Sequence, residues 1–226
     1  MWAEIKEHDT ILFASALIGL IAIMTVSASA ESDAACGIRK RTTGIVGLNI
    51  LLEGGFPEGT LIMVHGTAVT GVDLAARHFC HGSPDEEGMY FNADEVIELE
   101  NSRMNPAVLL EQMNGTRVAV DSFSTIINRY GIEQSLFLLS HVKETIRENH
   151  ANLMFVVYSG VHSPMEMTRI MRMADVVIEF KTEVSQAEIQ RTLAVQKIKG
   201  GAVPQRLLSF IITDNGIEAS TTSRVV

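Results

Sequence analysis

The stretch that decides the fold is residues 61–73, which read LIMVHGTAVTGVD. Apolar residues lead into Gly66, and a second glycine, Gly71, follows five positions later. This is the glycine spacing of the phosphate-binding loop G-x-x-x-x-G-K-[ST], which joins a buried strand to a helix. A helix-compatible run, 74–79, follows the second glycine. The stretch therefore predicts a strand, a loop and a helix in succession.

Two positions of this loop depart from the phosphate-binding pattern. Val72 stands where a lysine would reach the β- and γ-phosphates, and Asp73 stands where a hydroxyl would hold Mg²⁺. An ion pair at 4 Å is worth about 4 kcal/mol at an effective dielectric of 20, so losing the cation and adding an anion weakens triphosphate binding strongly. What remains is the set of backbone N–H groups at a helix N-terminus. The candidate nucleotide-binding positions are Gly66, Thr67, Thr70, Gly71, Val72 and Asp73.

The segment before this unit carries a far more specific pattern than two glycines. Residues 43–60 read TGIVGLNILLEGGFPEGT. They closely resemble the entry segment of the KaiC-like branch of the RecA superfamily, T-G-I-x-G-L-D-x-L-L-x-G-G-x-P-x-G-[ST]. Later blocks continue the resemblance: DSFSTI at 121–126, ADVVI at 174–178, RTLAVQKIKG at 191–200 and FIITDNGI at 210–217. The resemblance covers about 41–220.

The fold class expected from both the residues and the resemblance is α/β. Nearly continuous apolar runs alternate with amphipathic segments, which is typical of a parallel sheet buried on both faces. The resemblance implies a RecA-like P-loop NTPase fold, with a mainly parallel central sheet flanked by helices and an antiparallel C-terminal extension. Strands are expected at 61–64, 88–95, 117–122, 153–158, 174–180, 191–197 and 207–212, and a long amphipathic segment spans 133–149.

The resemblance also assigns roles to residues outside the loop. Asp94 and Glu95 match the paired carboxylates from which the family draws its general base. Asp121 ends an apolar strand as in a Walker B motif and would hold Mg²⁺. Lys197 and Lys199 match the K-x-R pair that reaches the nucleotide of a neighbouring subunit. A lysine at the second position keeps the charge and loses the planar fork of arginine.

Three functions are consistent with these residues. The first is a KaiC-like protein with a degenerate nucleotide site, a non-hydrolysing regulatory or scaffolding subunit that pairs with itself or with homologous subunits, as in archaeal signalling proteins. The alternative is an active ATPase in which a substitute cation such as Lys197 or Lys199 replaces the loop lysine, although Asp73 counts against it. The third is a membrane-tethered assembly protein, similar in fold to the ATPase of archaeal motility machinery. ATP and Mg²⁺ are therefore doubtful cofactors.

The charge and cysteine content limit the classes of binding partner and the cell compartment to be expected. The chain has 226 residues and a formal net charge of −9, and it lacks a basic stripe, so binding to nucleic acid is not expected. Its two cysteines, Cys36 and Cys80, form no C-x-x-C pair and imply no disulfide framework, which is typical of a cytoplasmic protein.

The first 38 residues are expected to be a segment apart from the KaiC-like domain at 39–226. Residues 11–30 carry no charge and are long enough for a membrane helix, and the basic run 39–41 follows them. By the positive-inside rule the domain would then face the cytoplasm. The alternative interpretation is that translation of the natural protein begins at Met24, which would leave only a short polar leader before the domain. The sequence leaves both open.

Two metal hypotheses and one surface hypothesis concern clustered side chains. Three strand-end acids, Asp94, Glu95 and Asp121, would meet above the sheet and are interpreted first as solvated or helix-capping carboxylates. Together with Asp73 they could instead hold a divalent ion or raise one another's pKa. A zinc site at His78, Cys80 and His81 is conceivable, but ordinary helix-surface roles are favoured because no fourth ligand is apparent. The methionines at 165–173 are interpreted as packing residues rather than as a partner surface.

Overall fold

A computed structural model describes residues 39–83, 86, 88–95, 115–185 and 188–219 of the chain. Its main sheet has eight strands in the order β10-β9-β8-β7-β3-β6-β5-β4. Five neighbouring strands are parallel: β3 (Leu61–Gly66), β4 (Gly88–Asn92), β5 (Arg117–Asp121), β6 (Asn152–Tyr158) and β7 (Val176–Val184). Three strands extend the sheet in antiparallel pairing: β8 (Ile189–Ile198), β9 (Leu208–Thr213) and β10 (Gly216–Ala219). The predicted fold class is confirmed.

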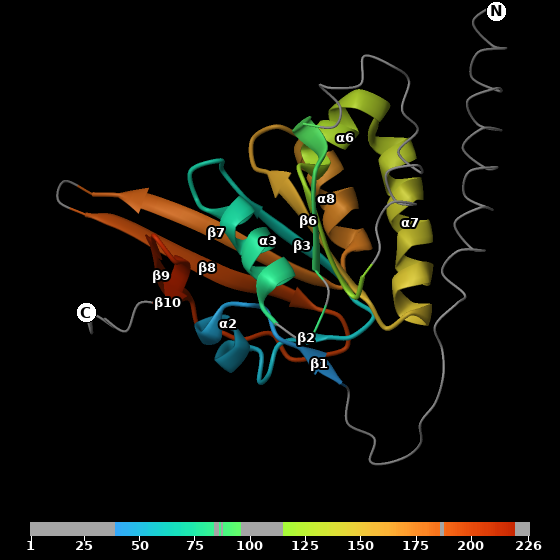
Figure 1. Ribbon diagram of the computed structural model, residues 1–226. Helices are drawn as coiled ribbons and strands as arrows, with labels where there is room; N and C mark the ends of the chain where they lie inside the picture. The colour runs from blue at the N-terminus through green and yellow to red at the C-terminus, as the bar shows by residue number, and fades with distance from the viewer. Residues whose placement is uncertain (1–38, 84–85, 87, 96–114, 186–187, 220–226) are drawn as a thin grey trace, which may run out of the picture.

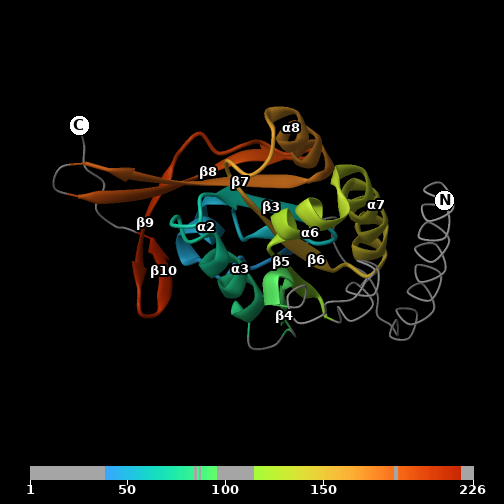
Figure 2. The same cartoon turned by 90° about the horizontal axis from the view of Figure 1, so that it is seen from above.

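Helices cover both faces of this sheet (Figures 1 and 2). One apolar core contains α6 (Phe123–Tyr130), α7 (Ile132–Glu148) and α8 (Pro164–Met173), and the other contains α2 (Val46–Leu51) and α3 (Val72–His81). Along β3, Leu61 and Met63 join the first core, whereas Ile62 and Val64 join the second. Burial on both faces explains why β3 reads as an unbroken apolar run instead of an alternating one.

Local signals explain where the helices begin. Ser122 precedes α6, and its hydroxyl accepts a hydrogen bond from the Thr125 N–H at 3.3 Å. Ser163 and Glu166 form a capping box at the start of α8, with Pro164 as the first helical residue. These contacts satisfy N–H groups that have no partner inside the helix. The long amphipathic segment predicted at 133–149 is α7.

The structure corrects two strand predictions. The strand expected to end in Asp94 and Glu95 ends at Asn92, and residues 93–95 form a helical turn. The Asn92 side chain accepts the Asp94 N–H at 3.1 Å and donates to Glu95 at 2.8 Å, so it competes with continued strand pairing. Residues 213–217 turn the chain into β10, a strand that was not among those predicted. β7 and β8 are longer than predicted and form a hairpin that extends beyond the helices (Figure 1).

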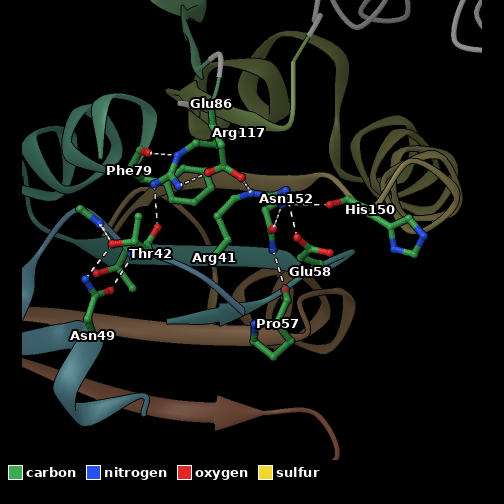
Figure 3. Close-up of polar contacts among 12 residues, drawn as sticks. Arg41, Thr42, Asn49, Pro57, Glu58, Phe79, Glu86, Arg117, His150 and Asn152 are labelled. Atoms are coloured by element: carbon green, nitrogen blue, oxygen red, sulfur yellow. Dashed lines mark hydrogen bonds and ion pairs between the residues drawn. The ribbon is translucent and has the colours of Figure 1, made fainter. Parts of the chain in front are cut away.

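A buried arginine pair joins the start of the domain to the sheet (Figure 3). Arg117, the first residue of β5, is fully buried and donates to the carbonyls of Phe79 at 2.7 Å and Thr42 at 2.6 Å. Glu86 accepts from Arg117 at 2.8 Å and from Arg41 at 2.7 Å. Burial alone would raise the pKa of Glu86, but the hydrogen bonds from the two arginines outweigh it and lower that pKa. One carboxylate thus bridges two guanidinium groups.

Arg41 extends this network toward the start of β6. It lies in a two-stranded ribbon formed by β1 (Lys40–Arg41) and β2 (Phe56–Pro57). Its guanidinium donates to the Asn152 side chain at 2.5 Å and lies 3.3 Å from Glu58. Asn152 in turn donates to the Pro57 carbonyl at 2.7 Å. The segment before α2 is therefore fixed to β5 and β6 by side-chain contacts as well as by burial.

Within the described part of the chain, no helix is long and apolar enough to cross a membrane. The membrane helix predicted at 11–30 lies outside the described residues.

Replacing Glu86 by Gln should destabilise the fold at neutral pH by roughly 2–4 kcal/mol, because it leaves the buried Arg117 guanidinium without its carboxylate partner and Arg41 with Glu58 alone. Since the pKa of Glu86 is lowered in the folded state, this stabilisation exists above the ordinary glutamate range and is lost as pH falls through it. Urea unfolding at neutral and acidic pH measures both effects. The matched control is Glu144→Gln, an exposed position on α7. Equal losses in the two variants would contradict the bridging role of Glu86.

Candidate functional site

The loop between β3 and α3 keeps the shape of a phosphate-binding loop through its glycines. A Cβ on Gly66 would lie 2.4 Å from the Thr70 hydroxyl and 2.8 Å from the Phe180 carbonyl oxygen. Gly71 has a φ of +85°, in the left-handed region. The Thr67 carbonyl accepts from the Thr70 N–H at 3.0 Å and from its hydroxyl at 2.7 Å. Steric contact and local hydrogen bonds therefore fix the loop without a ligand.

The two substituted positions begin α3. Val72 is fully buried in the core beneath this helix, in the place of the phosphate-contacting lysine. Asp73 is partly exposed in the first turn. A carboxylate there interacts favourably with the helix N-terminus and so uses the positive potential that would attract a phosphate.

Both oxygens of the Asp121 carboxylate accept hydrogen bonds from tyrosines. The Tyr90 hydroxyl donates to Oδ2 at 2.5 Å, and the Tyr158 hydroxyl donates to Oδ1 at 3.1 Å. Asp121 is 7% exposed, and burial raises its pKa, an effect that the tyrosines oppose and the charges of Asp73 and Asp94 reinforce. Burial and the neighbouring carboxylate raise the pKa of both phenols, so they remain protonated donors at neutral pH.

This cluster spans three neighbouring strands and the helix above them. Tyr90 belongs to β4, Asp121 to β5 and Tyr158 to β6. Arg77 on α3 stacks over the Tyr90 ring, with its guanidinium carbon 4.2 Å from the ring centroid. Asp73 lies one helical turn before Arg77, on the same side of α3. The structure thus brings the altered loop, the strand-end acid and two tyrosines together.

Asp94 and Glu95 lie at the same edge of the sheet and are held by neighbouring side chains. Asp94 accepts a short hydrogen bond from the Thr125 hydroxyl, and Glu95 accepts from Asn92 at 2.8 Å. Both side chains are exposed. In the part of the chain that the structure describes, no three His, Cys, Asp or Glu residues are arranged to hold a metal. The structure therefore lends no support to a divalent-ion site on these acids, and that hypothesis stays a prediction.

The hypothetical zinc ligands also point to separate partners. His78 Nε2 accepts the N–H of Ile217 on β10 at 2.9 Å. Cys80 donates to the Met89 carbonyl at 3.1 Å, and burial raises its pKa to about 12. The His81 ring lies 2.9 Å from a carbonyl of its own helix. The favoured reading of these residues as structural groups agrees with these contacts.

Lys197 and Lys199 lie where the parallel strands begin, whereas the loop lies where β3 ends. Lys197 is paired with Val177 near the start of β7, and its ammonium donates to the Ala174 and Met171 carbonyls at the end of α8, at 2.6 and 3.0 Å. Burial lowers the pKa of Lys197. Lys199 is 3.7 Å from Asp175, whose N–H bonds to the carbonyl of the first residue of β3. Within one chain, neither ammonium lies beside Gly66 or Gly71.

Tyr90, Tyr158 and Arg77 were not among the residues predicted for this site. A tyrosine at the end of a buried strand, as at Tyr158, is a usable signal because its hydroxyl needs a partner. The hydrogen bond between Tyr90 and Asp121 depends on the register of β4 on β5. This register places Asn92 opposite Asp121 and so brings the Tyr90 hydroxyl within reach of the carboxylate.

Replacing Tyr90 by Phe should cost about 1–3 kcal/mol of stability at neutral pH, since the buried Asp121 carboxylate loses a donor. The variant raises the pKa of Asp121 further. A carboxyl whose pKa is raised in the folded state binds more protons in that state than in the unfolded state. Stability therefore falls as the pH rises from the ordinary aspartate pKa through the raised pKa of Asp121. The cost should therefore grow from acidic to neutral pH in urea unfolding. In an Asp121→Asn background this pH dependence should disappear; a cost that is independent of pH in the wild-type background would contradict the assignment.

Comparisons with known proteins agree with the geometry. A model of a family of unknown function (DUF7125) matches residues 92–224. The UPF0273 protein PF1931 of Pyrococcus furiosus is 23% identical over 232 residues, which cover 80% of this chain and 93% of that protein. The UPF0273 protein PH0284 of Pyrococcus horikoshii is 24% identical over 231 residues, which cover 79% and 93%.

A solved structure shares the fold. The KaiC-like protein PH0186 from the hyperthermophilic archaeon Pyrococcus horikoshii OT3 superposes with a TM-score of 0.63 at 20% identity, covering 81% of this chain and 100% of that one. The RecA-like fold implied by the sequence resemblance is thereby confirmed. The family model matches more than half of this chain, so the chain belongs to the DUF7125 family and has the fold of the KaiC-like proteins.

Proposed function

We propose that this protein is a KaiC-like subunit with a degenerate nucleotide site, which does not hydrolyse ATP and acts as a regulatory or scaffolding subunit in signalling. The observation that carries the proposal is the pairing of both Asp121 oxygens with tyrosine hydroxyls. Where a hydrolase needs this acid for Mg²⁺, directly or through water, the protein supplies two O–H donors of its own.

The metal side of the site argues against nucleotide chemistry. Mg²⁺ demands near-octahedral oxygen ligands and binds proteins through one or two carboxylates together with substrate phosphates. To reach Asp121, the ion would have to displace hydrogen bonds to a charged group, each worth about 1.5–3 kcal/mol. Asp73 is the other acid of the site, and it repels the phosphates that would share the ion. Metal and triphosphate therefore cannot support each other here as they do in an active enzyme.

The water-activating side supports the same conclusion. The two family general-base positions, Asp94 and Glu95, bond to Thr125 and Asn92, and neither is buried. A general base has to hold the attacking water within hydrogen-bond reach, and here each of these acids already accepts a hydrogen bond from another side chain. Without a bound triphosphate these acids serve as helix-turn and strand-end contacts.

We infer that the partners are a second copy of this chain or homologous KaiC-like subunits. Lys199 is the better candidate for contact with a neighbour's nucleotide, since its side chain is 59% exposed, whereas Lys197 is engaged at the end of α8. An active ATPase with a substitute cation is the competing function. Arg77 is a described cation at the loop edge of the sheet, but it stacks on Tyr90.

The test is binding of a fluorescent ATP analogue with Mg²⁺. We expect no binding at micromolar concentrations to the wild type, and a gain in the Val72→Lys, Asp73→Thr variant that increases when Tyr90→Phe and Tyr158→Phe are added. Asp214→Thr, which removes an exposed carboxylate elsewhere, is the matched control. Thermal unfolding of each variant confirms that it is folded, because Val72 is buried. Micromolar binding to the wild type would instead support the ATPase.

A further inference from the structure

Four hydrogen-bonded side chains lie in a row on the face of the sheet that α8 covers: Glu179, Gln196, His65 and Ser159. The proposed function does not use this network. His65, in β3, is 4% exposed and alternates with Met63 of that core. Its Nε2 lies 3.2 Å from Gln196 Oε1 of β8, and its Nδ1 lies 3.4 Å from Ser159 Oγ, directly after β6. Gln196 Nε2 donates to Glu179 of β7 at 2.7 Å.

The charges of this chain decide which nitrogen of His65 carries the proton. Glu179 pairs with Lys181 at 3.0 Å, and an ionised carboxylate only accepts hydrogen bonds. The NH₂ group of Gln196 must therefore face Glu179, which leaves its carbonyl oxygen toward His65. His65 then donates through Nε2–H, and Nδ1 presents a lone pair to the Ser159 hydroxyl. This is the tautomer that a general base for Ser159 requires.

The protonation state and the surroundings fit the same role. Burial lowers the pKa of His65, an effect that outweighs the hydrogen bond that the ring donates to Gln196, so the ring is neutral at neutral pH. Ser159 is partly exposed, and a Cβ added to the next residue, Gly160, would meet no heavy atom within 4 Å. Val161, which follows, is 48% exposed. The partly exposed Ser159 is thus followed by an unobstructed glycine and an exposed apolar side chain.

We propose that Ser159 is a nucleophile activated by His65 and that this site accepts small apolar acyl groups from activated esters. Ser159 Oγ bonds to the carbonyl carbon while its proton passes to His65 Nδ1. The ester C–O bond breaks, and the departing alcohol takes that proton. Water then attacks the acyl-serine by the same route, which releases the carboxylic acid and restores Ser159. The 3.4 Å separation belongs to the unliganded site, where catalytic hydrogen bonds are often long.

Gln196 and Glu179 are positioning residues in this scheme, because they fix the His65 ring and its tautomer without touching substrate. They correspond in role to the third member of a nucleophile–base arrangement. The proposal does not depend on the acids of the nucleotide site: none of the four side chains contacts Asp73 or Asp121 in the described contacts, and the link to the loop is the backbone hydrogen bond from the Ser159 N–H to the Gly66 carbonyl at 2.8 Å. Failure of one proposal therefore leaves the other intact.

The test is covalent labelling of the full chain with a fluorophosphonate probe, which reacts when a serine oxygen attacks phosphorus and fluoride leaves. Peptide mass spectrometry should find the adduct on Ser159, and Ser159→Ala should abolish it. His65→Gln should slow labelling about 100-fold, the size of a general-base contribution. Ser209→Ala, at an exposed serine of β9, is the control and should label as the wild type does.

The pH dependence of the labelling rate distinguishes a Ser159 activated by His65 from a serine that is only exposed. Labelling by a His65-activated serine should level off above the lowered pKa of the ring and stay flat from neutral to mildly alkaline pH. Gln196→Met alters an exposed side chain, so it should stay folded while it slows labelling and removes the plateau. The absence of an adduct on folded wild type, a rate unchanged in His65→Gln, or a rate that keeps rising with pH would each overturn the proposal.

Discussion

Strand β5 buries a charge at each of its ends, and much of the surrounding structure serves to satisfy these two groups. Arg117 opens the strand with no exposure, and Asp121 closes it with 7%. Removing an ion from water costs several kcal/mol unless it is paired and hydrogen-bonded. At the amino end Glu86 and two carbonyls meet this need, and at the carboxyl end Tyr90 and Tyr158 do.

The carboxyl end shows how this fold satisfies its strand-end acid with side chains of the protein. In an active relative the strand-end acid shares a cation with the triphosphate, so ligand and protein complete the site together. Here the acid accepts two hydrogen bonds from the protein, Gly66 leaves room for the close approach of Thr70 and Phe180, and Thr70 closes the turn on the Thr67 carbonyl. Loop shape and nucleotide chemistry are thus separable: the first depends on these local contacts, and the proposed loss of the second rests on Val72, Asp73 and the tyrosines.

The sequence predicted the parts of the fold that depend on local signals. The unit from β3 to α3, strand β5 and helix α7 follow from apolar runs, glycine spacing and amphipathic periodicity. What escaped prediction depends on pairings between distant segments. The Tyr90 contact with Asp121 requires the register of β4 on β5, and Arg117 reads as an ordinary charged residue at a strand start until Glu86 and the Thr42 carbonyl are placed beside it. Lys197 matched a phosphate-contacting position, yet it donates to carbonyls at the end of α8, a role that only the three-dimensional fold defines.

The central claim is that the tyrosines satisfy Asp121 and keep it from a metal ion. Its most direct test is a carbon-13 NMR titration of the Asp121 carboxyl in the full chain, with and without millimolar Mg²⁺ and ATP. The structure predicts a pKa above the ordinary aspartate value that does not change when Mg²⁺ and ATP are added. A bound cation favours the ionised carboxylate, so a pKa that falls on addition would contradict the account and place Asp121 at a working nucleotide site.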